Sequence, residues 1–509
     1  MEHSEQKKAC WACRSSKIRC NRNTPTCLQC LRTGKGCQYG LRLSWPRESD
    51  ARRSIVCRAR PNTRASNCET HFVNTRFADV ELHYALYHSQ LYHWGNRTTA
   101  LECLSHQYKT SVSHGIPRPL PWIASGNSQN ESHLLSYYDE VLSVMLTSID
   151  DPKFRSLLIS MSFIDSAPSS IAVQQALYAL IAIHIYGPTE AKRYKLRAIT
   201  ALSQSFNNPL STKEGLQQIA ARLLLSICEM LDSSESPQLW KFHAGMAKQI
   251  GIKICSSNQS YGGDVSVVLN WLFYHEALAR FSGRHWNSIG FFSVEAHCMR
   301  DSLITRAVLL SSDASKIINM AGCSAEVLSI IPRISDNVRS RADTNHSQIE
   351  TVEALNMLER RLTHLKQYVD QDDGSDRSSQ HRHALNIAEL YRLASLVYLQ
   401  RAGKGYPTNK PGVLSLVNAG FEIIATLQTC PRVFPLIILG CEARSDEDRM
   451  IILELLRKTE NSRRIGNFSR ARRFIEASWA QDDLHTGELD YVQKFDTIMS
   501  RSEDMPSFS

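Results

Sequence analysis

Six of the fifteen cysteines lie within the first 37 residues, at spacings that suit metal coordination. They are Cys10, Cys13, Cys20, Cys27, Cys30 and Cys37. The unit Cys-x2-Cys-x6-Cys occurs twice, and a shift of 17 residues superimposes one copy on the other. Two thiolates three residues apart can hold one ion, and a short helix can return the third. The repeat therefore predicts that this segment folds around metal.

The number of cysteines indicates how many ions are bound. A structural zinc site is tetrahedral and needs four ligands, so one repeat with three thiolates cannot complete a site. Two zinc ions need eight ligand positions, which six cysteines supply only if two thiolates bridge both ions. We therefore predict a binuclear cluster with two Zn²⁺ per chain and these six cysteines as ligands. Two ions and six thiolates together contribute a charge of about −2.

Three other uses of the cysteines fit the sequence less well. Disulfide bonds are disfavoured because the first eight residues are polar and contain no apolar signal-peptide core. A single four-cysteine zinc site would leave two cysteines unused although they are in register. A metal-storage segment would not interleave basic residues and Ile18 on helical spacing. The binuclear cluster accounts for all six positions.

The basic residues are concentrated in the same part of the chain. Residues 1–64 contain fifteen Lys and Arg against four acidic residues, a charge of +11. The whole chain carries +9, so the remaining 445 residues sum to −2. With the cluster formed, the N-terminal part keeps about +9. A basic head on a nearly neutral body is typical of proteins that bind a polyanion such as DNA.

The cysteine segment resembles the DNA-binding domain of fungal Zn2Cys6 transcription factors. All six cysteines match that pattern, Pro25 stands where the family has a loop proline, and Lys17-Ile18-Arg19-Cys20 keeps the ending of its first helix. The resemblance implies a nuclear regulator of RNA polymerase II transcription that binds double-stranded DNA. It also implies that Cys10 and Cys27 are the bridging thiolates.

The same resemblance assigns roles to the basic residues. It makes Lys17 the base contact, donating to guanine O6 and N7 of a CGG-type triplet in the major groove. The expected phosphate contacts are Arg14, Arg19, Arg32 and Lys35. Ser15 and Ser16 depart from the pattern, because the family commonly has Lys or Arg there.

Helical patterns dominate the rest of the chain. Residues 171–186 are almost entirely apolar and stop at Gly187-Pro188, Ser211 and Glu214 form a candidate capping box, and residues 384–399 are apolar apart from a narrow polar stripe. The polar residues 370–383 are expected to form a loop. The predicted fold is a small metal-nucleated Zn2Cys6 domain with two short helices, followed by a large all-α domain.

The expected domains are a disordered N-terminus (1–9), the Zn2Cys6 domain (10–40), a basic linker (41–77) and the all-α domain (78–509). The chain after the cysteine segment resembles the fungal arginine-metabolism regulators, with their helical regulatory domain, in short stretches such as residues 39–45, 134–139 and 435–443. No uninterrupted run of about 18 apolar residues occurs, so we expect no membrane-spanning helix and no membrane partner. Self-association through the helical domain, co-regulators and a small-molecule effector remain open.

No catalytic motif was found, and we expect no enzymatic activity and no catalytic residue. His275-Glu276 begins a zincin-like His-Glu-x-x-His, but Ala279 stands where the second histidine belongs. Two alternatives to a transcription factor remain: an enzyme or scaffold that the zinc head docks on DNA, and a zinc-dependent module that binds proteins. A module that binds proteins would not explain the excess of arginine in the head.

Overall fold

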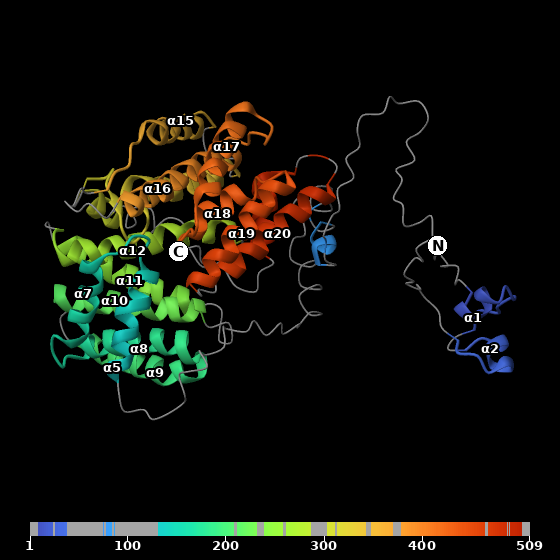
Figure 1. The fold of residues 1–509 in the computed structure, drawn as a ribbon, viewed down its shortest axis with the longest axis horizontal. Coiled ribbons are helices and arrows are strands. Elements are labelled where there is room, and N and C mark those ends of the chain that lie inside the picture. Colours follow the sequence, from blue (N-terminus) through green and yellow to red (C-terminus); the bar gives the residue numbers. More distant parts are fainter. Residues whose placement is uncertain are drawn as a thin grey trace. The chain divides into compact units, whose positions relative to one another are not determined.

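The computed structural model divides the chain into two compact units, Met1–Phe72 and Val73–Ser509 (Figure 1). It describes residues 9–23, 26–37, 75, 78–83, 86, 131–207, 211–231, 239–257, 261–286, 303–310, 313–342, 348–369, 378–463, 467–485, 487 and 489–500. The expected disordered N-terminus up to residue 8, Pro25 and nearly all of the expected linker lie outside these residues.

The described part of the first unit contains two short helices, α1 (Trp11–Ser15) and α2 (Leu28–Thr33). Helices of five and six residues are too short to be stable alone in water. Among the described residues of this unit, the buried hydrophobic ones are cysteines: Cys10, Cys13, Cys27 and Cys30. The two helices therefore depend on what those thiols bind, as expected for a metal-nucleated fold.

The described residues of the second unit form helices and one very small strand pair. The first half contains α5 (Glu131–Tyr137), η2 (Tyr138–Leu142), α6 (Ser143–Leu146), α7 (Pro152–Phe163), α8 (Pro168–Tyr186), α9 (Pro188–Gln204), η3 (Ser205–Asn207), α10 (Thr212–Leu231), α11 (Leu239–Ser257) and α12 (Asp264–His285), followed by a helix over residues 303–310. The second half contains β1 (Ile317–Ile318), β2 (Cys323–Ser324), α14 (Ala325–Ala342), α15 (Gln348–His364), α16 (Ser378–Tyr398), η4 (Leu399–Gly403), α17 (Pro411–Thr426), α18 (Val433–Gly440), α19 (Asp446–Arg463), α20 (Asn467–Leu484) and α21 (Tyr491–Ser500). The predicted fold class, a small cysteine-cluster domain followed by a large helical domain, is confirmed.

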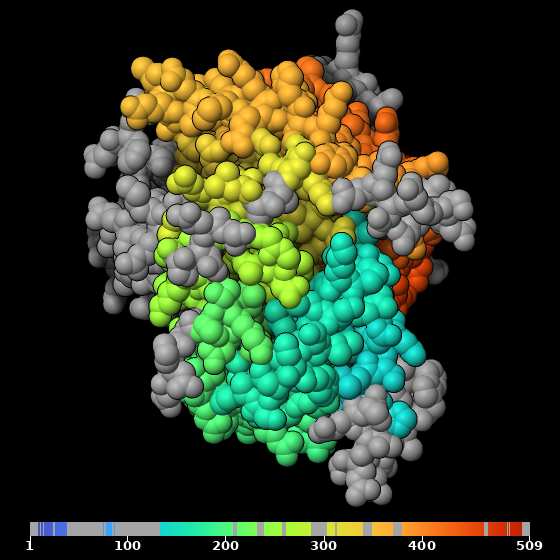
Figure 2. All heavy atoms as spheres, turned by 90° about the vertical axis from the view of Figure 1, so that its left-hand side faces the viewer, coloured from blue at the N-terminus to red at the C-terminus, as the bar shows by residue number. Residues whose placement is uncertain are grey.

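Neighbouring helices in the sequence pack against each other within this unit. Helix α8 contacts α7, α9 and α10, while α12 contacts α14, and α16 contacts α17 and α18. The helices α8 and α9 lie at one end of the unit, and α15 to α17 lie at the opposite end (Figures 1 and 2). One continuous apolar core connects the two ends.

Helix α8 is strongly apolar, and it ends where the sequence predicts. The Gly187 N–H bonds to the carbonyls of Ala182 and Ile183, both at 3.1 Å, and Pro188 begins α9. By length and composition α8 could cross a membrane, a property that the search for uninterrupted apolar runs did not reveal. However, 78% of its apolar window is buried inside the unit. A helix that is apolar on all sides is expected at such a core position.

Other sequence predictions had mixed outcomes. The capping box of α10 is confirmed, since the Ser211 N–H bonds to Glu214 (3.0 Å) and the Glu214 N–H bonds to the Ser211 hydroxyl (3.2 Å). The predicted loop over 370–383 is wrong at its end because α16 already begins at Ser378. In the polar stripe of α16, Ser395 is buried and donates to the Tyr391 carbonyl at 2.7 Å. A hydroxyl that bonds within its own helix can enter the core.

Candidate metal centre and nucleic-acid interface

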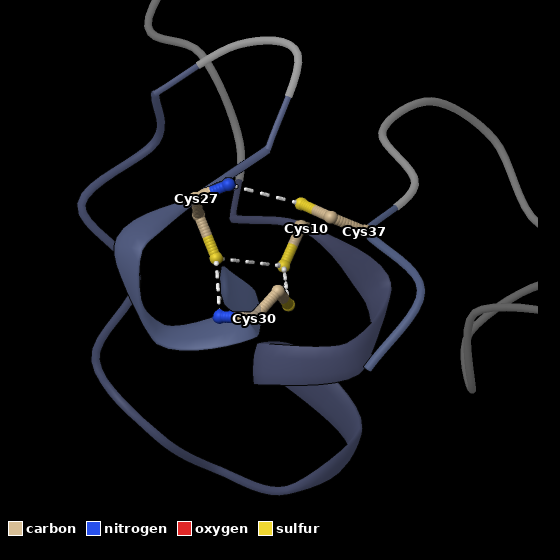
Figure 3. Close-up of side chains that lie close together, drawn as sticks. All are labelled: Cys10, Cys27, Cys30 and Cys37. Atoms are coloured by element: carbon tan, nitrogen blue, oxygen red, sulfur yellow. Dashed lines mark hydrogen bonds between the residues drawn. The ribbon is translucent and has the colours of Figure 1, made fainter. Parts of the chain in front are cut away.

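The six cysteines converge in the first unit. Cys10, Cys13, Cys27 and Cys30 are buried, and the remaining two are partly buried. Figure 3 shows the side chains of Cys10, Cys27, Cys30 and Cys37 close together beside the short helices. The Cys10 and Cys27 sulfurs are 3.7 Å apart, and Cys10 to Cys30 and Cys13 to Cys27 are each 3.6 Å. In a tetrahedral zinc–thiolate site, Zn–S bonds of about 2.3 Å place the sulfurs about 3.8 Å apart. The observed spacings fit such a site.

The sulfurs form two overlapping groups of four. One group is Cys10, Cys13, Cys20 and Cys27, and the other is Cys10, Cys27, Cys30 and Cys37. Within each group all ligand atoms lie within 4.8 Å of one another. Two tetrahedral sites can therefore be built, and the sulfurs of Cys10 and Cys27 belong to both.

The protonation of these thiols also fits a cation at the centre. A hydrogen bond from the Cys30 N–H to the Cys27 sulfur (3.3 Å) lowers the pKa of Cys27 to about 6. Burial and the neighbouring Cys10 sulfur raise the pKa of Cys13 to about 12, and burial also raises that of Cys30. Thiolates this close together repel each other, so they ionise together only around a positive ion.

The two repeats have equivalent backbone hydrogen bonds as well as equivalent cysteines. The Ile18 N–H bonds to the Cys13 carbonyl (2.9 Å), and 17 residues later the Lys35 N–H bonds to the Cys30 carbonyl (3.2 Å). This bond between residues five apart closes a Schellman motif, whose penultimate residue adopts a left-handed conformation. That residue is Lys17 in the first repeat, with φ of 52°, and Gly34 in the second, with φ of 62°.

The basic residues assigned from the sequence are exposed around this cluster. Lys17 and Arg19 follow α1, Arg32 lies in the last turn of α2, and Lys35 follows that helix. Within residues 9–23 and 26–37, no carboxylate forms an ion pair with any of the four. Arg14 lies on α1, but its side chain is outside the described part of the chain. The four described cations are available to an external anion.

Asn21 is a positioning residue that no sequence pattern predicts. Its side-chain oxygen accepts the Leu28 N–H at 2.9 Å and so satisfies a donor at the start of α2. This bond ties the loop between the repeats to the second helix. Asparagine is a common helix cap, but a cap seven residues before the helix follows no local pattern.

Comparison with known proteins gave two domain matches and two relatives. Residues 8–46 match the fungal Zn(2)-Cys(6) binuclear cluster domain, and residues 133–507 match the fungal specific transcription factor domain. "Transcription factor iacI" of Pestalotiopsis fici is 30% identical over 398 residues, covering 77% of this chain and 98% of that protein. The "Thiamine biosynthesis regulatory protein" of Saccharomyces cerevisiae is 48% identical over 40 residues, covering 8% of this chain and 9% of that protein. No solved structure matches.

Proposed function

This chain belongs to the fungal transcription factors that carry a Zn2Cys6 binuclear cluster, and we propose that it reads a CGG-type DNA triplet to regulate transcription by RNA polymerase II. The cluster domain of this family binds two zinc ions through six cysteines and binds DNA. The head therefore supplies zinc-dependent DNA binding, and the helical unit is the fungal specific transcription factor domain.

We propose that Cys10 and Cys27 bridge the two ions. Support comes from the two groups of four sulfurs, which share these two residues. Cys13 and Cys20 would complete one tetrahedron, and Cys30 and Cys37 the other. The ions supply positive charge that holds the thiolates together, and the chain supplies the spacing and the backbone N–H donors to sulfur.

We propose that Lys17 contacts bases, and one observation carries this assignment. Lys17 holds a left-handed backbone at the position where the equivalent repeat has Gly34. A residue with a Cβ pays roughly 1–2 kcal/mol for this conformation. Strain of this kind is concentrated at functional positions, because the side chain is needed there. An exposed, unpaired ammonium can donate to guanine O6 and N7, whereas glycine offers no side chain.

We propose phosphate contacts for Arg14, Arg19, Arg32 and Lys35. For the last three, the described side chains are exposed and unpaired, as phosphate contacts require. They carry positive charge on both repeats, so the head can be anchored on either side of Lys17. Phosphate contacts fix the register of a protein on DNA but carry no sequence information.

We also propose that the protein acts in the nucleus, where its DNA is, and that it belongs to the branch of arginine-metabolism regulators. Support for this branch comes from the short stretches between Tyr39 and Ala443. The matched domains are those of transcription factors, so we propose no catalytic activity. Microscopy of a fluorescently tagged chain in a fungal host tests the location.

The proposed function is tested by comparing Lys17→Ala with Arg32→Ala in the zinc-loaded full-length protein. We expect Lys17→Ala to reduce the discrimination between CGG and altered triplets by about 1–3 kcal/mol. Arg32→Ala should weaken binding to all sequences alike, because phosphates do not differ between sequences. Fluorescence anisotropy with labelled duplexes measures both.

A matched control is Arg197→Ala, which removes an exposed charge from α9 in the other unit. It should leave both affinity and discrimination unchanged. Each variant must retain two zinc ions by native mass spectrometry, since loss of folding would imitate loss of contacts. If Lys17→Ala weakens every sequence equally, Lys17 is a phosphate contact and the base assignment is wrong.

A further inference from the structure

A groove lies in the helical unit where three helices meet. Its walls come from α12, from the helix over residues 303–310 and from α14, and its volume is about 500 Å³. Pockets that hold small organic ligands have volumes of about 300–1,000 Å³. The groove is therefore large enough for one small organic molecule and much larger than an inorganic ion.

Apolar side chains from all three helices line the groove. They are Phe273 and Ala277 from α12, Leu309 and Leu310 from the short helix, and Pro332 from α14. Pro332 stands inside α14 and has no N–H, so the Leu328 carbonyl lacks its usual helical donor. A proline within a helix also bends it. This departure from regular helix coincides with the groove.

Most of the charges in the groove are compensated by neighbours. Arg280 pairs with Asp336 at 2.6 Å, and Glu276 pairs with Lys248 at 3.2 Å. Two guanidinium groups in the groove have no such ion pair. Arg306 on the short helix and Arg333 on α14 line the groove, and neither forms an ion pair with any residue that the structure describes. The groove thus presents, from different helices, two guanidinium groups that have no ion-pair partner among the described residues, although the Asp336 carboxylate, already paired with Arg280, partly offsets the charge of Arg333.

Arg333 lies in an environment that favours an added anion. Partial burial and the nearby positive charge of Arg361 lower the pKa of Arg333. Arg361 is itself paired with Glu326 at 2.9 Å, so that carboxylate is already engaged. An anion in the groove would offset the repulsion between the guanidinium groups of Arg333 and Arg361. A planar carboxylate also matches the donor geometry of a guanidinium.

We propose that this groove binds a small organic anion, with an apolar body against Phe273, Ala277 and Leu309 and a carboxylate held by Arg306 and Arg333. An inorganic anion would leave the apolar lining unused, and a neutral apolar molecule would leave the guanidinium groups unused. Nothing in this inference depends on DNA binding, because all of these residues lie in the helical unit.

The test uses 2-naphthoate as the probe and 2-naphthylmethanol as its neutral counterpart, with the zinc-loaded full-length protein and isothermal titration calorimetry. The two molecules share the same ring and differ in charge. We expect saturable binding of one 2-naphthoate per chain, at least about tenfold tighter than the alcohol. No saturable naphthoate binding at millimolar concentration, or equal affinity for the alcohol, would overturn the proposal.

Variants locate the site. The double variant Arg306→Gln/Arg333→Gln should lose the preference for naphthoate over the alcohol, and each single variant should weaken naphthoate binding. Arg197→Gln, which removes an exposed and equally unpaired guanidinium from α9, should change neither. Both groove arginines are exposed, so their substitution is not expected to unfold the domain. Naphthoate binding that survives the double variant places the ligand elsewhere and contradicts the proposal.

Discussion

Lys17 and Gly34 occupy equivalent left-handed positions, 17 residues apart, at the ends of the two helices of the cysteine cluster. Their φ angles are 52° and 62°, and the N–H of the following residue closes the same hydrogen bond in both repeats. The backbone requirement is therefore common to both repeats, but only the second meets it with glycine. The first repeat retains a lysine at an energetic cost, which supports the base contact proposed for Lys17.

This relationship predicts opposite effects of substitution at the two positions. Gly34→Ala should weaken the folded head by about 1 kcal/mol, because a Cβ at Gly34 meets nothing within 4 Å and only the backbone conformation is penalised. Lys17→Gly should strengthen it by up to about 1 kcal/mol while reducing base discrimination as Lys17→Ala does. Since metal binding is coupled to folding, competition with a zinc chelator measures both changes. A loss of zinc affinity in Lys17→Gly would show that Lys17 is not strained.

A second prediction concerns the shared thiolates. Removing a bridging ligand damages both tetrahedra, so Cys10→Ser or Cys27→Ser should lose both zinc ions and unfold the head. Cys20→Ser is the matched control, because Cys20 belongs to one group of four sulfurs. This variant should keep one tightly bound ion in the group that contains Cys30 and Cys37. Native mass spectrometry counts the ions, and equal losses in Cys10→Ser and Cys20→Ser would contradict the bridging assignment.

A third prediction concerns acid stability of the helical unit. His275 is buried on α12, and its Nε2 accepts the Trp271 indole N–H at 3.1 Å, so the ring is neutral. Burial and the charge of Arg432 lower the pKa of His275 to about 3. An unfolded histidine takes up its proton near pH 6.5. The stability contributed by the neutral ring is therefore fully present above pH 6.5 and is lost as the pH falls towards 3.

His275→Gln tests this relation because glutamine cannot titrate but still offers an acceptor to Trp271. Between pH 7 and pH 4, the unfolding free energy of the variant should fall by on the order of 3 kcal/mol less than that of the wild type. Urea unfolding followed by far-UV circular dichroism reports mainly on the helical unit. Identical pH profiles would show that His275 is protonated in the folded protein or exposed in it.

The cysteine spacing predicts the metal centre well because nearby residues in a short segment have few ways to converge. The end of α8 and the capping box of α10 follow from local rules for the same reason. The left-handed Lys17 could not be predicted, since lysine disfavours that conformation and only the hydrogen bond to Cys13 reveals it. The groove could not be predicted either, because it joins helices from residues 273, 309 and 332, whose packing no local pattern encodes.

One titration decides whether the head recognises DNA in a zinc-dependent way. The affinity of the zinc-loaded full-length protein for a CGG duplex and for a duplex with an altered triplet is measured across salt concentrations, with and without a zinc chelator. Four phosphate contacts predict a log–log slope of about −3 to −4 for both duplexes, since each neutralised phosphate contributes about −0.9. The CGG duplex should bind more tightly at every salt concentration, and the chelator should abolish binding. A flat salt response without sequence preference, unaffected by zinc removal, would contradict the account and favour a protein partner for the head.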